Sequence, residues 1–76
     1  MTPLQIKHIR RSYAMSANTF ASLTGVASGR TVRRWEAGDS AVPGSVVNLL
    51  RILGWIDPTA RNSAINHILL VIRASP

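Results

Sequence analysis

The 76-residue sequence contains no cysteine, so neither disulfides nor thiolate metal sites can add to its stability. No stretch reaches the ~18 apolar residues of a membrane span. The N-terminus also lacks the charged segment and apolar run of a signal peptide. We therefore expect one compact domain, residues 1–76, that is held by packing and located in the cytoplasm.

Acidic residues are also scarce, since three Asp and Glu stand against nine Lys and Arg and leave a formal net charge of +6. A protein this small and this basic attracts polyanions such as nucleic acid or an anionic membrane. The planar arginine fork suits phosphate and guanine edges, whereas a merely solubilising surface would normally mix Lys with Glu. The composition favours nucleic acid, because eight of the nine cations are Arg10, Arg11, Arg30, Arg33, Arg34, Arg51, Arg61 and Arg73.

Strand-like alternation is missing, and the sequence predicts an all-α domain of five short helices. Ser16 and Ser28 are suitable N-caps for the second and third helices. Glycines are expected to end the second, third and fourth helices, at Gly25, Gly38 and Gly54. The expected helices span residues 3–13, 17–24, 29–37, 43–53 and 58–74.

The third helix carries the most distinctive pattern. Val32 and Trp35 are three residues apart and predict a buried face, whereas Arg30, Arg33 and Arg34 remain for the outer side. Such a face can simply be solvated, but three arginines within five residues and no compensating acid favour binding to DNA. Trp35 could instead stack on a base, although its spacing favours core packing.

Further motifs surround this helix: Ile6-x-x-Ile9-Arg10, Met15-Ser16-x-x-x-Phe20-Ala21, Gly25-Val26, and Val-Arg-Arg-Trp-Glu-Ala-Gly over residues 32–38. Together they resemble the lambda-repressor-like (Cro/cI, or XRE) helix-turn-helix family over roughly residues 3–53. The resemblance implies a helix-turn-helix core over residues 2–53. Two helices joined by a short glycine turn can cross steeply, which leaves the second free to enter a major groove about 12 Å wide.

The resemblance also implies roles for individual residues. Arg10 is expected to pair with Glu36, and Val32 and Trp35 to hold the third helix on the core. The start of the second helix is expected to bind phosphate through backbone N–H groups. The expected base contacts are Gly29, Arg30, Thr31 and Arg34, and the expected phosphate contacts are Ser16, Ala17, Asn18, Ser28 and Arg33.

The turn between the second and third helices is one residue longer than the commonest family spacing. A similar turn, followed by Trp-Glu-x-Gly-x-Ser-Ala-Val-Pro, looks like that of anti-CRISPR-associated regulators, and residues 36–43 match it closely. Those proteins repress phage operons that contain their own genes. We therefore expect a repressor of a phage or mobile-element operon, such as an anti-CRISPR operon, that also acts on its own promoter. It is expected in a bacterial host cell, on the nucleoid when bound to DNA.

The fifth helix has a wider apolar face than a small core needs, which favours a C-terminal dimerisation helix over residues 57–74. A two-fold dimer would place recognition helices roughly 34 Å apart and select an inverted repeat. One alternative is an antitoxin-type protein that binds a partner toxin. Another is nonspecific nucleoid or RNA binding. The expected dimer contacts are Ile65, Ile68, Leu69 and Ile72.

Other functional readings find little support in the sequence. His8 and His67 are far apart and have few carboxylates around them, so no metal is expected. A hydrolase could be composed from Ser45, His67 and Asp57, but no nucleophile elbow accompanies them. We expect no enzymatic activity, cofactor, small-molecule substrate or membrane partner.

A few residues stay open to more than one interpretation. Trp55 could be a hinge, an interface anchor or an ordinary packing residue, and Tyr13 could reach a phosphate or cover the edge of the first helix. Isolated exposed arginines usually only solubilise a surface. We therefore expect no base contact from Arg51, Arg61 or Arg73.

Overall fold

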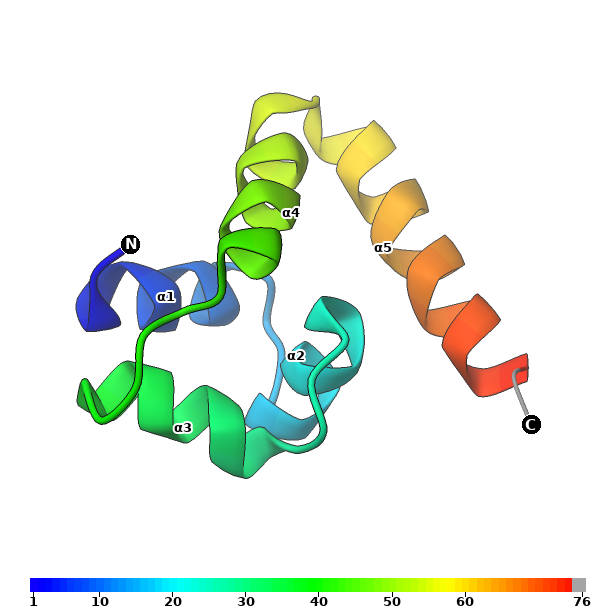
Figure 1. The fold of residues 1–76 in the computed structure, drawn as a ribbon. Helices are drawn as coiled ribbons and strands as arrows, with labels where there is room; N and C mark the ends of the chain where they lie inside the picture. The colour runs from blue at the N-terminus through cyan, green and yellow to red at the C-terminus, as the bar shows by residue number, and fades with distance from the viewer. Residues whose placement is uncertain (75–76) are drawn as a thin grey trace.

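The computed structural model describes residues 1–74 and the side chains of residues 1–71. Over this part the chain is all-helical, with five helices and no strand. Figure 1 shows that α1, α2 and α3 form the lower body of the molecule, while α4 rises from it and α5 descends beside α2. The helices are α1 (Pro3–Ser12), α2 (Ala17–Thr24), α3 (Gly29–Ala37), α4 (Gly44–Trp55) and α5 (Pro58–Ala74).

Local hydrogen bonds explain why the helix starts are readable in the sequence. The Thr2 hydroxyl accepts from the Gln5 N–H at 3.1 Å, and the Gln5 side chain accepts from the Thr2 N–H at 2.8 Å. The Asp57 carboxylate accepts from the N–H groups of Thr59 and Ala60, the first two of α5, at 3.0 and 3.1 Å. Each cap satisfies donors that have no acceptor within their own helix.

The predicted end of α4 at Gly54 is wrong, because the helix continues to Trp55. Gly25 and Gly38 end their helices in the left-handed conformation, with φ of +78° and +81°, but Gly54 does not adopt it. The helix stops because the backbone of Ile56 is extended, with φ of −79° and ψ of 160°. The burial of Leu53 just before the glycine keeps this turn of α4 on the core.

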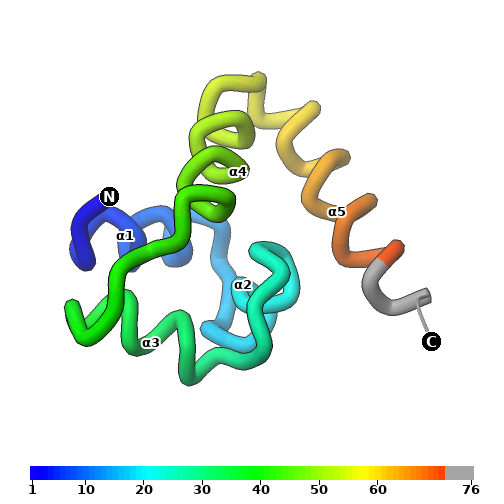
Figure 2. The backbone as a smooth tube through the Cα atoms, viewed as in Figure 1, coloured from blue at the N-terminus to red at the C-terminus, as the bar shows by residue number. Residues whose placement is uncertain are grey.

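The core lies where α1, α2 and α3 meet beneath α4 (Figure 2). Its largest fully buried side chains come from these four helices, whereas among the described side chains of α5 only Ile65 is buried. Helix α5 packs on α2 and α4. The buried residues are Ile6, Ala17, Phe20, Ala21, Leu23, Val32, Trp35, Val46, Leu50, Leu53 and Ile65.

Arg61 is a structural residue, which corrects its expected role as an isolated surface cation. Its Nε donates to the Leu53 carbonyl at 2.7 Å, and its Nη2 donates to the Ile56 carbonyl at 3.4 Å. Its guanidinium also lies 5.7 Å from the centre of the Tyr13 ring. One side chain therefore connects the end of α1, the end of α4 and the start of α5.

Candidate nucleic-acid interface

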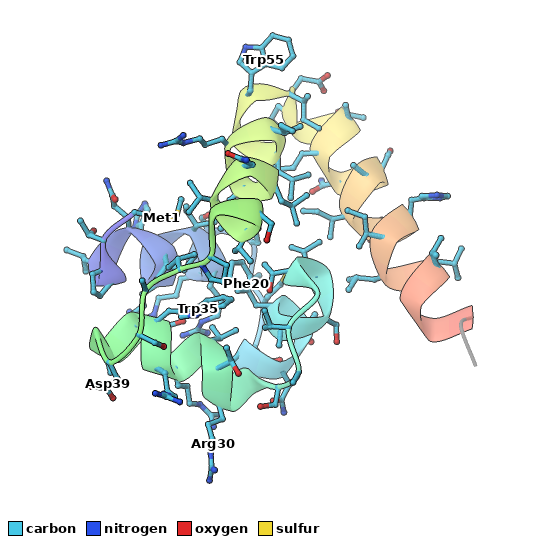
Figure 3. The ribbon with its side chains drawn as sticks, viewed as in Figure 1. Met1, Phe20, Arg30, Trp35, Asp39 and Trp55 are labelled. Atoms are coloured by element: carbon cyan, nitrogen blue, oxygen red, sulfur yellow. The ribbon has the colours of Figure 1, made fainter. Side chains whose placement is uncertain are left out.

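Helix α3 has two sharply different faces. Val32 is fully buried and Trp35 is 2% exposed, so both hold the helix on the core. Arg30, Arg33 and Arg34 are all exposed. Figure 3 shows Arg30 pointing away from the domain, while Trp35 points into it. At 100° per residue the three arginines fall within one arc of the helix, opposite Val32 and Trp35.

The start of α3 is fastened by a residue of α2. The Asn18 side-chain oxygen accepts from the Gly29 N–H at 3.1 Å. Ser28 occupies the N-cap position, but its hydroxyl makes no capping hydrogen bond. The helix therefore begins where the sequence predicts, but the side chain that caps it comes from the start of α2.

Gly29 is needed at this junction because two backbones approach closely. It is buried, and a Cβ atom there would overlap the Asn18 side-chain oxygen and lie 2.9 Å from the Asn18 backbone nitrogen. The expected base contact by Gly29 is therefore wrong, since the residue faces α2 and its N–H is already bonded. Of the other expected contacts in this turn, Ser28 is exposed and Thr31 is half-buried.

The end of α3 is fastened by the expected ion pair. Arg10 donates from Nε and Nη2 to the two Glu36 carboxylate oxygens at 2.7 and 3.0 Å. These hydrogen bonds raise the pKa of Arg10 above its ordinary value, against the lowering effect of burial. Arg10 Nη1 also donates to the Met15 carbonyl at 3.0 Å, just before α2. One guanidinium therefore joins α1, the approach to α2, and α3.

The start of α2 lies beside the start of α3 and offers backbone donors. The Ser16 hydroxyl accepts from the Thr19 N–H at 3.1 Å, so it serves as the N-cap. The N–H groups of Ala17 and Asn18 have no acceptor within the helix. Ala17 as a residue is 6% exposed, so its methyl group makes no contact with a ligand. Because the Asn18 oxygen is bonded to Gly29, its NH₂ group is the part left to donate outward.

The acidic residues leave this surface strongly positive. Glu36 is paired with Arg10, and Asp57 caps α5. Asp39 lies in the loop after α3 and is exposed. The arginines of α3 have no acidic partner among the described residues, so their charge is available to an anion.

The four residues of α5 expected at a dimer contact differ in how far they are buried in their own chain. Ile65 is 6% exposed and belongs to the core of its own chain, so it cannot also line an interface. Ile68 and Leu69 are half-buried against the same core. The side chain of Ile72 lies outside the described residues. The apolar surface that α5 does expose includes Leu70, which is 66% accessible.

Among the described residues, no three His, Cys, Asp or Glu side chains are grouped so that they could hold a metal ion. No described helix combines the length and apolar character needed to cross a bilayer. The exposed face of α3 has a clear chemical character of its own, because three arginines lie on one side of it.

No family model, curated protein or solved structure matches this chain. The positions of its side chains and backbone donors define the surface formed by α3 and the start of α2. Its chemistry is that of an anion-binding face, with arginine side chains along one helix and backbone donors at the start of another.

Proposed function

We propose that this chain is a sequence-specific double-stranded DNA-binding repressor in which α2 and α3 form a helix-turn-helix. One observation carries the proposal: α3 exposes Arg30, Arg33 and Arg34 on one side, while Val32 and Trp35 anchor its other side. A helix with side chains is about 10–12 Å across, which suits the major groove. The anchoring residues are separate from the arginines, so the helix can enter the groove without leaving the core.

Arg30 and Arg34 are the proposed base readers. They lie four residues apart and therefore project together from the outer side of α3. Each guanidinium can bond bidentately to guanine N7 and O6, and such a contact is worth about 1–3 kcal/mol of discrimination against the wrong base. The preferred site should therefore contain guanines.

The start of α2 is the proposed phosphate contact. The free N–H groups of Ala17 and Asn18 and the positive end of the helix dipole favour an anion there. Because Asn18 also caps α3, a phosphate bound to its NH₂ group would fix the register of α3 along the groove. Ser28 and Arg33 are exposed and supply further donors.

Repression is proposed to act by occupancy, with a homodimer covering an inverted repeat in the promoter of its own phage or mobile-element operon and blocking RNA polymerase. The exposed apolar end of α5, with Leu70, supports contact between two copies. The buried Ile65 is not part of that contact.

The first test is a gel shift that compares DNA upstream of the gene with a scrambled duplex of the same composition. At about 0.15 M salt, specific sites are typically bound at least 10³-fold more tightly than nonspecific DNA. Equal affinity for both duplexes would contradict sequence-specific repression. A steep salt dependence with no sequence preference would instead indicate nonspecific nucleic-acid binding.

Arg34→Ala tests the base reading. It should lower the preference for the correct site over the scrambled duplex about 10- to 100-fold. Arg51→Ala, which removes an exposed arginine on α4, is the matched control and should leave the ratio unchanged. If both variants lower the two affinities equally, the arginines act only as general positive charge.

A further inference from the structure

A second surface, to which none of the α3 arginines contributes, has the character of a protein-binding groove. It lies between α1 and α4, with a volume of about 580 Å³. Its floor is apolar and includes Ile9 and Val47, and one wall carries Leu4, which is 77% exposed. A leucine so exposed beside a hollow offers apolar contact area that the chain itself does not use.

The α4 wall continues this groove along the helix. Val47, Arg51 and Trp55 follow one another at intervals of four residues and therefore form one row. Trp55 is 86% exposed at the end of that row, and Figure 3 shows it projecting from the molecule. An elongated occupant that lies along α4 would contact all three residues. Since α4 is about 18 Å long at 1.5 Å per residue, a helix of three to four turns fits its length.

The charge around the groove identifies the occupant. Arg51 and His8 line it, and none of its lining residues is acidic. Of the three acidic residues, Glu36 is paired to Arg10, Asp57 caps α5, and Asp39 lines a separate hollow that shares Met1 with the groove. A partner therefore meets an apolar floor, an arginine at the rim and the positive field of a chain that carries a formal charge of +6.

We propose that the α1–α4 groove binds an amphipathic helix of another protein, whose apolar face is flanked by Asp or Glu. Its apolar side chains would pack on Leu4, Val47 and Trp55, and its carboxylates would face Arg51. A second copy of this chain fits less well, because none of its three acidic residues lies on a helix with an exposed apolar face. Nucleic acid has no apolar segment to fill the floor.

The groove can be occupied while α3 faces DNA. Trp55 and Arg30 lie at opposite ends of the molecule in Figure 3. The proposal does not depend on DNA binding by α3, since none of the residues that line the groove belongs to α3. It adds a route by which another protein could be brought to the repressor or could control it.

The experiment uses a fluorescently labelled synthetic peptide helix with leucines at positions i, i+3, i+4 and i+7 and glutamates on the flanking positions. Binding to the intact chain is measured by anisotropy without DNA. Two control peptides carry Lys in place of Glu or Ser in place of Leu, and we expect both to bind at least tenfold more weakly. Amide chemical shifts locate the peptide and should move at Leu4, Val47 and Trp55.

Two variants test the site on exposed positions, where folding should be retained. Leu4→Glu removes an apolar contact and adds a repelling charge, and should weaken the acidic peptide about tenfold or more. Its matched control, Leu70→Glu on α5, should have little effect. Arg51→Glu should weaken the acidic peptide several-fold, whereas Arg33→Glu on α3 should weaken only DNA.

Each possible result supports or contradicts the proposal that the α1–α4 groove binds an acidic amphipathic helix. Shifts at the named residues, together with weaker binding by Leu4→Glu and Arg51→Glu, support it. Equal binding of the glutamate and lysine peptides would contradict the charge argument. Chemical-shift changes confined to α5 would also overturn the proposal. Self-association that Leu4→Glu abolishes would overturn it too, because a second copy of this chain would then occupy the groove. Loss of DNA binding with intact peptide binding would contradict only the repressor function.

Discussion

Helices α3 and α5 both lie at the surface, but they are attached in different ways. The nine residues of α3 include three buried ones, Gly29, Val32 and Trp35. In the 17-residue α5, Ile65 is the buried one among the described side chains. Helix α3 is also fastened at both ends by polar side chains from other helices, at Gly29 and at Glu36. A short helix held in this way can present side chains in a fixed geometry.

The two helices also expose different kinds of surface. Helix α3 exposes charge and buries its apolar residues, whereas α5 exposes Leu70 and keeps half-buried residues on its inner face. A rigid charged face suits recognition of a polyanion, where donors must be in place before binding. A loosely attached helix with apolar surface suits contact with protein, and it should open locally before α3 does.

Of the contacts tested here, loss of the Arg10–Glu36 ion pair at the end of α3 should lower the stability most. Arg10 and Glu36 are only 18% and 9% exposed, so Arg10→Met leaves a largely buried carboxylate without its partner. We expect a loss of about 3 kcal/mol in the free energy of unfolding, measured by urea denaturation. The double variant Arg10→Met with Glu36→Leu should recover much of that loss. A single variant as stable as the wild type would mean that α3 is not held at this end.

Gly29→Ala tests the contact between Gly29 and Asn18 at the start of α3. The added methyl group would meet the Asn18 side chain and backbone, so we expect a loss of about 1–3 kcal/mol in urea denaturation. Gly44→Ala is the matched control, because Gly44 also begins a helix but has open space around it. That variant should be neutral or slightly stabilising. Equal effects at both glycines would argue against the close approach of α2 and α3.

Asn18→Asp separates the structural role of Asn18 from its proposed contact with DNA. Aspartate keeps an acceptor for the Gly29 N–H and suits a helix start, so stability should be unchanged or slightly raised. The new carboxylate would face phosphate, and affinity for all duplexes should fall about tenfold in gel shifts. Asn48→Asp on α4 has the same charge change on an exposed site and should have a much smaller effect. Equal affinities would place the start of α2 away from the backbone of the DNA.

The attachment of α5 should be the weakest of those tested. Arg61→Met removes the hydrogen bonds to the Leu53 and Ile56 carbonyls and the contact with Tyr13. Water can reach these partly exposed groups, so we expect a loss of about 1 kcal/mol. Hydrogen exchange should rise in α5 and little in α3. A larger loss than that of Arg10→Met would reverse the comparison between the two helices.

Much of this fold follows from local patterns. Thr2, Ser16 and Asp57 cap their helices by hydrogen bonds over two or three residues, and such bonds can be predicted from sequence. The spacing of Val32 and Trp35 likewise predicts which side of α3 is buried. Local sequence therefore gives the element order and the exposed arginines.

The failures concern contacts between distant residues. The hydrogen bond from Gly29 to Asn18 spans eleven positions, and nothing local indicates that Gly29 faces α2. Ile65 was expected at an interface because the sequence does not show how many apolar residues of α5 the other helices cover. Arg61 was expected to be isolated because the carbonyls that it bonds lie in the last turn of α4 and in Ile56, the residue after it.

The central claim, that the exposed arginines of α3 read DNA, is tested most directly by selecting bound duplexes from a random library. The wild-type chain should enrich an inverted repeat whose half-sites contain guanine and lie about one helical turn apart. Arg34→Ala should lose the guanine preference at one position in each half-site and keep the rest. No enriched sequence, or the same sequence for both proteins, would contradict the account.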